Sequence, residues 1–97
     1  MPTFIRLASL TEQGIKNIRD LQEMLAEAQV IMEKHGVHLQ QGWATLGDYD
    51  VVAVIEAPDA RTAAQVSALI AAKGNFRAKT LSAVPMEDLT DSFRDET

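Results

Sequence analysis

The sequence predicts an α+β fold in which a four-stranded antiparallel sheet carries two helices on one of its faces. Three observations lead to this prediction. A long segment near the N-terminus has apolar residues spaced by three and four, two strand-like segments flank a short turn that contains glycine, and an alanine-rich helical segment begins directly after Pro58. Strands and helices therefore follow one another in the order βαββαβ.

The first half of the chain is predicted to form a strand and one long helix. Residues Thr3–Ser9 alternate in polarity, which is typical of a strand. Ser9 with Glu12 fits a capping box at the start of the helix, and Thr11 is the alternative cap. Gly36 supplies the left-handed residue that ends the helix. Apolar residues mark one stripe along this helix, at Ile15, Ile18, Leu21, Met24, Leu25, Ala28, Ile31 and Met32.

The second half begins with two strands, predicted at Val37–Leu46 and Asp50–Ala57. The link between them is so short that the strands must run antiparallel, and Gly47 permits the positive φ that such a turn requires. Pro58 stops the second of these strands, and Asp59 is a good N-cap for the helix that follows.

That helix is predicted at Ala60–Lys73, where Gly74 follows its end. A fourth strand is predicted at Phe76–Val84, and residues 85–97 are expected to form a helical turn and an acidic tail that frays. The βαββαβ order is that of the ferredoxin-like split βαβ motif, which predicts the strand order 4-1-3-2 with both helices on one face of the sheet.

Alternation divides each strand into two sets of side chains. The third strand is apolar in both sets, which is typical of a strand covered on both sides. A one-residue bulge would exchange the two faces of any strand. Assigning the more apolar set of each strand to the helices predicts an open face made of Phe4, Arg6, Ala8, His38, Gln40, Val52, Val54, Glu56, Arg77 and Lys79.

An open face that is half apolar needs a cover, because each large apolar side chain left in water forfeits about 1.5–3 kcal/mol. A second copy of the same sheet is the expected cover, since two-fold homodimers are the commonest oligomers. Two such sheets face to face form a dimeric α/β barrel, with space for a small-molecule ligand between them.

Length and composition limit the classes of function. The chain has 97 residues, which suits one domain over residues 1–97. Its net charge of −5 argues against nucleic acid as a partner, and no apolar stretch approaches the ~18 residues of a membrane span. No signal peptide is recognised, so a cytoplasmic location is expected. Without cysteine, disulfide and thiolate chemistry are excluded.

The sequence contains no nucleophile motif, phosphate-binding glycine loop or set of metal ligands, so we expect no cofactor and no metal. His38 and Tyr49 are the candidate acid–base residues, His38 because an imidazole titrates near neutrality. Tyr49 also has a structural interpretation, in which its ring packs at the sheet edge. The candidate ligand-binding residues are Arg6, His38, Tyr49, Asp50, Glu56 and Arg77.

Two further structural interpretations stand beside the ligand-binding one. Asp50 is typical of a turn whose backbone is bonded by the carboxylate. Arg6 and Glu56 are expected to be cross-strand neighbours that form an ordinary ion pair. Alternatively, Arg6 with Arg77 or Lys79 forms the floor of an anion site inside the dimer, where arginine holds a carboxylate or phosphate bidentately.

The segment LGDYDVVAVIEAPD (residues 46–59) resembles the GYD-domain family of small proteins. Supporting similarity lies upstream in TEQGIKNIRD and downstream in GNFRAKTLSAV, so that the resemblance covers nearly the whole chain. It implies a ferredoxin-like fold of the dimeric α/β-barrel group, without an established reaction. It also implies that Gly47, Tyr49 and Asp50 carry shared polar positions of the family, with Glu56 and Asp59 close behind.

The leading functional hypothesis is a homodimeric, non-catalytic module that binds a small molecule or a partner protein. The alternative is a cofactor-independent oxygenase or isomerase that acts on a small organic compound, with His38 or Tyr49 as its acid–base group. A third possibility is that the acidic surface and tail serve protein contacts alone. Fold analogy cannot choose among them, because this architecture carries many functions.

Overall fold

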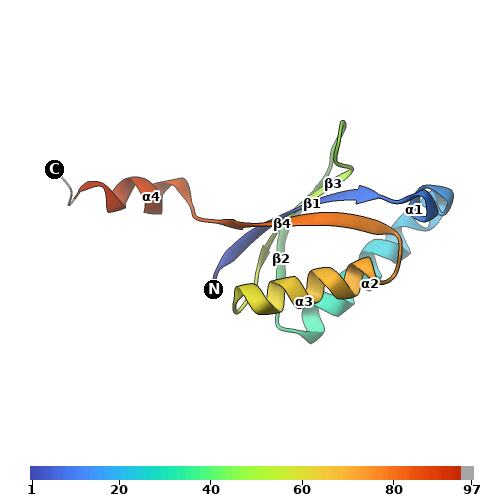
Figure 1. Cartoon of the computed structure of the whole chain (residues 1–97), viewed down its shortest axis with the longest axis horizontal. Coiled ribbons are helices and arrows are strands. Elements are labelled where there is room, and N and C mark those ends of the chain that lie inside the picture. The colour runs from blue at the N-terminus through green and yellow to red at the C-terminus, as the bar shows by residue number, and fades with distance from the viewer. Residues whose placement is uncertain (95–97) are drawn as a thin grey trace.

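The structure is a computed structural model that describes residues 1–94 of the chain. Its elements follow the predicted order, with two short helices added (Figure 1). In chain order they are β1 (Thr3–Leu10), α1 (Glu12–Lys16), the 3-10 helix η1 (Ile18–Asp20), α2 (Leu21–Lys34), β2 (His38–Ala44), β3 (Val51–Glu56), α3 (Ala60–Ala71), β4 (Phe76–Ala83) and α4 (Met86–Ser92).

The strands form one antiparallel sheet in the order β2-β3-β1-β4. This is the predicted order read from the other edge, so the prediction of an α+β fold with this sheet is confirmed. Helices α2 and α3 lie on one face of the sheet, and α4 projects away from this body beyond the end of β4 (Figure 1). Among the described residues, no helix combines the length and the apolarity that crossing a bilayer requires.

The single long helix predicted after β1 is wrong, because the segment is divided into α1, η1 and α2. Thr11 is the N-cap, and its hydroxyl accepts a hydrogen bond from the Gly14 amide at 3.1 Å, so the alternative to Ser9 is the correct cap. Asn17 is the C-cap of α1, and its side-chain amide donates to the Gln13 carbonyl at 3.0 Å. Asparagine competes in this way with the helical backbone, which explains the interruption.

α1 is held against the loop that joins α3 to β4. The Thr11 amide donates to the Asn75 carbonyl oxygen at 3.0 Å, and the Gln13 side-chain amide donates to the Lys73 carbonyl at 3.1 Å. A Cβ atom on Gly14 would overlap the Asn75 carbonyl oxygen. This close approach explains why a glycine stands inside a helix, where its intrinsic propensity is poor.

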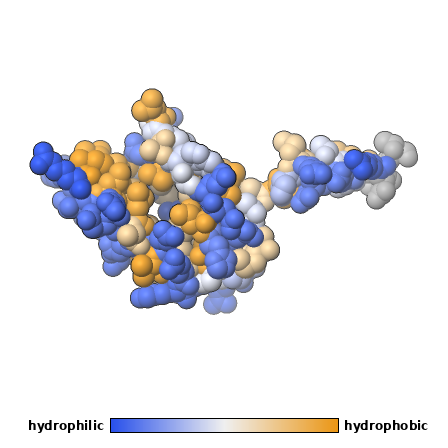
Figure 2. Space-filling model, turned by 180° about the vertical axis from the view of Figure 1, so that it is seen from behind, coloured by the Kyte–Doolittle hydropathy of each residue, from blue (hydrophilic) through white to orange (hydrophobic). Residues whose placement is uncertain are grey.

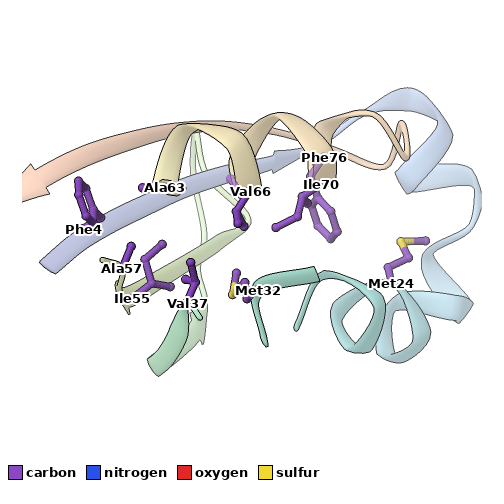
Figure 3. Close-up of a cluster of buried hydrophobic side chains, with 11 residues drawn as sticks. Phe4, Met24, Met32, Val37, Ile55, Ala57, Ala63, Val66, Ile70 and Phe76 are labelled. Carbon is purple, nitrogen blue, oxygen red and sulfur yellow. The ribbon is translucent and has the colours of Figure 1, made fainter. Parts of the chain in front are cut away.

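The hydrophobic core fills the space between the helices and one face of the sheet (Figure 3). Val37, Ile55 and Val66 are its fully buried members, and they come from the residue before β2, from β3 and from α3. The remaining core residues are Phe4, Ala8, Met24, Met32, Ala57, Ala63, Ile70 and Phe76.

For β1, the predicted assignment of faces is wrong. Arg6 lies opposite Ala53 of β3 and Thr80 of β4, and the Thr80 hydroxyl is 3.3 Å from the Ser67 hydroxyl of α3. Residues opposite each other in neighbouring strands share a face, so Arg6 points toward the helices. The even-numbered residues of β1 therefore belong to the helix-facing side of the sheet rather than to the open face.

The open face of β1 consequently carries Ile5 and Leu7, which lie opposite Val54 and Val52 of β3. Comparing the apolarity of the odd-numbered and even-numbered side chains of β1 does not predict which set faces the helices, because both sets supply apolar area. The ring of Phe4 is buried in the core, and a long arginine side chain covers apolar surface with its aliphatic stem.

In β2, a bulge changes the alternation. The register shifts between Leu39 and Gln41, with Gln40 in the bulge, so that Trp43 lies opposite Val52 of the open face. Simple alternation would instead have grouped Trp43 with Leu39 on the helix side. The predicted open-face residues of β3 and β4 keep that face.

The N-cap of α3 gives a pH-dependent prediction. The Asp59 carboxylate accepts a hydrogen bond from the Thr62 amide at 2.7 Å, and this bond lowers the pKa of Asp59 below its ordinary value of 3.8. The capping contribution is therefore present above that ordinary value and is lost as the pH falls through the depressed pKa. We expect the wild-type melting temperature to fall more steeply than that of Asp59→Asn as the pH falls from about 5 to about 2, the range in which aspartate carboxyls become protonated.

Thermal unfolding followed by circular dichroism measures this difference, and asparagine caps equally well without titrating. Asp59→Ala, which removes the cap at every pH, should be the least stable of the three near neutrality. Parallel pH profiles for the wild type and Asp59→Asn would contradict the assignment.

Candidate functional site

A cavity of about 590 Å³ lies between the helix-facing side of the sheet and the segment formed by η1 and α2. Its floor comes from β1, β2 and β3, and Ile70 and Phe76 close one side. Figure 2 shows this body from behind, with apolar residues gathered around a hollow in its surface. The lining residues with polar side chains are Arg6, Gln29, Trp43, Thr45 and Asp50, and the others are apolar or glycine.

The cavity exists because the floor is built from small residues. Gly42 lies opposite Ala53, and Ala53 lies opposite Arg6, which makes one row across three strands. The next row is formed by Ala44, Val51 and Ala8. Glycine and alanine leave unfilled the space that larger core side chains would occupy beneath α2, and a Cβ on Gly42 would have no atom within 4 Å.

Arg6 is the unusual residue of this cavity. It is only 5% exposed, and its Nη1 atom is buried without a hydrogen-bond partner. No ion pair to Arg6 occurs within the part of the chain that the structure describes. Loss of hydration by burial lowers the pKa of Arg6. Because buried polar groups are almost always bonded, an unpartnered guanidinium nitrogen here requires an explanation.

The mouth of the cavity is apolar. Three apolar residues at its mouth are partly open to solvent, with exposures between 40% and 45%: Ile18, Leu25 and Leu39. Exposed large apolar residues are ordinary when scattered singly, but a group around one opening is typical of a binding site.

Asp50 lies at the edge of the cavity and anchors the turn between β2 and β3. Its Oδ2 accepts from the Leu10 amide at 2.8 Å, and its own amide donates to the Ala8 carbonyl at 2.8 Å. The predicted role of this carboxylate in backbone bonding is thus correct, although the bond reaches β1 rather than the turn itself. Gly47 has the predicted positive φ, at 100°. The Thr45 hydroxyl donates to the Tyr49 carbonyl at 2.6 Å, which closes the turn.

The remaining candidate residues lie away from this cavity. His38 is exposed on the edge strand β2, opposite Glu56. The Glu56 carboxylate lies 3.9 Å from the N-terminal amine of Met1. Neither His38, Tyr49 nor Glu56 is among the residues that line the cavity. The expected cross-strand neighbourhood of Arg6 and Glu56 is wrong, because the two side chains lie on opposite faces of the sheet.

Arg77 and Lys79 are exposed on the open face of β4, opposite Ser9 and Leu7 of β1. The anion-binding floor expected from Arg6 together with these residues is therefore not assembled, since Arg6 alone points to the helix side. Sequence reasoning singled out Arg6 and Asp50 but missed Gln29 and Thr45. A signal was present in the small residues of β2 and β3, which predict space beneath a helix.

A second hollow, of about 480 Å³, is bordered by α1, α2 and the loop that precedes β4. Its lining is rich in acidic residues, including Asp20, Glu23 and Glu27. Glu27 forms an ion pair with Lys73 at 2.8 Å. In the described part of the chain, no three histidine, cysteine or acidic residues are grouped so as to hold a metal ion.

Comparison with known proteins gives two matches. A family model described as the GYD domain matches residues 4–92. A protein of Thermus thermophilus with the name glutamine synthetase and cystathionine beta-lyase binding protein is 39% identical over 90 residues, which cover 92% of this chain and 95% of that protein. No solved structure matches significantly.

Proposed function

Because this chain belongs to the GYD-domain family, we propose that it is a non-catalytic interaction module that binds a metabolic enzyme. The observation that carries the proposal is the similarity, over nearly the full length of both chains, to a relative named for its binding to two enzymes. A glutamine synthetase and a cystathionine beta-lyase are therefore the first partners to test.

Two apolar surfaces support a role in protein contacts. The open face of the sheet presents Ile5, Leu7, Val52 and Val54, which are all only partly buried, together with Leu81, which is 46% exposed. The projecting helix α4 exposes Met86 and Leu89, and the exposed Phe93 follows its last residue, which gives a second apolar surface. Apolar patches of this kind are typical of protein–protein interaction sites.

We further propose that the open face pairs with the same face of a second copy, which gives a dimeric α/β barrel of ferredoxin-like domains. A two-fold interface must be complementary to itself. The open face carries acidic Glu56 near one edge and basic Arg77 and Lys79 at the other, with apolar residues between them. An arrangement that brings the basic edge of one copy over Glu56 of the other satisfies this requirement.

Binding to the enzymes is tested with purified glutamine synthetase and cystathionine beta-lyase from the source organism of this chain. Isothermal titration calorimetry at micromolar concentration should show saturable binding to at least one enzyme. An unrelated oligomeric enzyme of similar size is the control. Failure of both enzymes to bind would overturn this assignment of partners.

The dimer gives a prediction for sedimentation velocity. Wild-type protein at micromolar concentration is expected to sediment as a dimer, whereas Val54→Asp should be monomeric. The substitution would bury two unpaired carboxylates in one interface, and we expect the dissociation constant to rise at least about 100-fold.

The matched control is Val30→Asp, which makes the same change at a 49% exposed position of α2, outside the open face. This variant should remain dimeric. A monomeric wild type, or a Val54→Asp variant that dimerises as tightly as the wild type, would refute the sheet-to-sheet dimer.

A further inference from the structure

We propose that the cavity beneath α2 binds a small organic monocarboxylate with an apolar body, whose carboxylate is held by the guanidinium of Arg6. This site lies on the opposite side of the sheet from the proposed dimer interface. The proposal of this ligand site can therefore be tested independently of the proposed partners and of the proposed dimer.

The need for an anion follows from the state of Arg6. The residue is 95% buried, as its exposure of 5% implies, and its Nη1 atom has no hydrogen-bond partner. Arginine is a permanent cation that presents a planar fork of donors matched to a carboxylate. Across the sheet, its neighbours are Ala53 and Thr80, and the Thr80 hydroxyl contacts Ser67 instead.

The charge of the lining points to a single negative charge on the ligand. Among the residues that border the cavity, Arg6 is the only cation and Asp50 the only anion. The Asp50 carboxylate already accepts the Leu10 amide. A phosphate ester would bring nearly two charges, for which this lining offers one arginine and a repelling carboxylate, so a monocarboxylate fits better.

The apolar lining of the cavity indicates that the rest of the ligand is apolar. Apolar side chains of α2 and of the floor surround Arg6, and the partly exposed residues Ile18, Leu25 and Leu39 form the mouth. A volume of about 590 Å³ lies within the usual range for small-molecule sites. An aliphatic or aromatic body would bury the apolar mouth while its carboxylate reaches the arginine.

The chain carries its own reporter for the test. Trp43 is the single tryptophan, and it lies in β2 between Gly42 and Ala44 of the cavity floor. Its ring is on the other face of the sheet, so it reports on the cavity through the strand that it shares with the floor. Titration of its fluorescence with 4-phenylbutyrate, and separately with 4-phenylbutyramide, compares two probes of nearly equal size and shape that differ in charge. In the wild type, the acid should bind at least about tenfold more tightly than the amide, because a charge-assisted hydrogen bond is roughly twice as strong as a neutral one.

Three variants identify the site. Arg6→Met should abolish the preference for the acid, whereas Arg77→Met, the same substitution on the open face, should retain it. Gly42→Val adds side-chain volume where a Cβ meets no atom within 4 Å, so it should weaken the binding of both probes. The melting temperature of Arg6→Met should rise by several degrees, since the substitution removes an unpaired buried charge.

Equal affinity of the wild type for acid and amide would overturn the proposal, and this comparison needs no folded variant. If 4-phenylbutyrate did not saturate the protein at millimolar concentration, the proposal would also be overturned. Arg6 would then be a structural residue. Retention of the acid preference in Arg6→Met, or its loss in Arg77→Met, would place the binding elsewhere on the chain.

Discussion

Replacement of Ile55 by alanine is expected to lower the free energy of unfolding by about 2–5 kcal/mol. Ile55 is fully buried on the helix-facing side of β3, among Phe4, Val37 and Val66 of the core. Truncation removes apolar area and leaves a cavity that the surrounding strands and helices cannot fully close. Because small domains have only about 5–15 kcal/mol of total stability, this loss is a large fraction of the whole.

Urea denaturation followed by circular dichroism measures the effect. Val54→Ala is the control, since Val54 is the preceding residue of β3 and points to the open face. It should cost clearly less than Ile55→Ala at concentrations where the protein is monomeric. Equal costs at such concentrations would mean that β3 has no preferred face, which contradicts the described packing.

Gly14→Ala is the second substitution with a large expected effect, and its sign is opposite to that given by helix propensity. Alanine in a helix is favoured over glycine by about 1 kcal/mol. Here its Cβ would overlap the Asn75 carbonyl oxygen, which belongs to the backbone and cannot rotate away. Separating α1 from that loop would also strain the bonds from Thr11 and Gln13. We expect a net loss of about 1–3 kcal/mol.

The control is Gly42→Ala, because no atom lies within 4 Å of a Cβ at that position and its φ is not positive. That variant should be neutral or slightly stabilising. If Gly14→Ala were instead as stable as the wild type in urea denaturation, α1 could not lie as close to the loop before β4 as the structure places it.

The polar groups of the cavity favour binding over acid–base catalysis. Arg6 carries a permanent charge and Asp50 is engaged with the Leu10 amide, so neither is placed as a free proton donor or acceptor. His38 and Tyr49, the residues on which an enzymatic function would depend, do not border the cavity. The arrangement therefore agrees with the proposal that the protein is an interaction module with a ligand site.

The candidate site could be predicted only in part. Arg6 was recognisable as a candidate because it was expected beside Arg77 and Lys79 on the open face, and Asp50 because the family resemblance implies a shared polar position there. Their partners were not, since the position of Arg6 depends on which face of β1 meets the helices. The exposed mouth at Ile18 and Leu25 also reads as core in the sequence, where residues on an apolar helical stripe are expected to be buried.

The sequence by itself determined the order of elements, the sheet topology, the turn at Gly47 and the helix cap at Asp59, because these depend on local periodicity and on residues with special backbone preferences. Tertiary structure alone decided which face of β1 is buried, where β2 has its bulge and where the first helix breaks. Alternation is symmetric between two faces, so the choice is made by contacts between distant segments. The same contacts bury Arg6 beneath α2 without a partner.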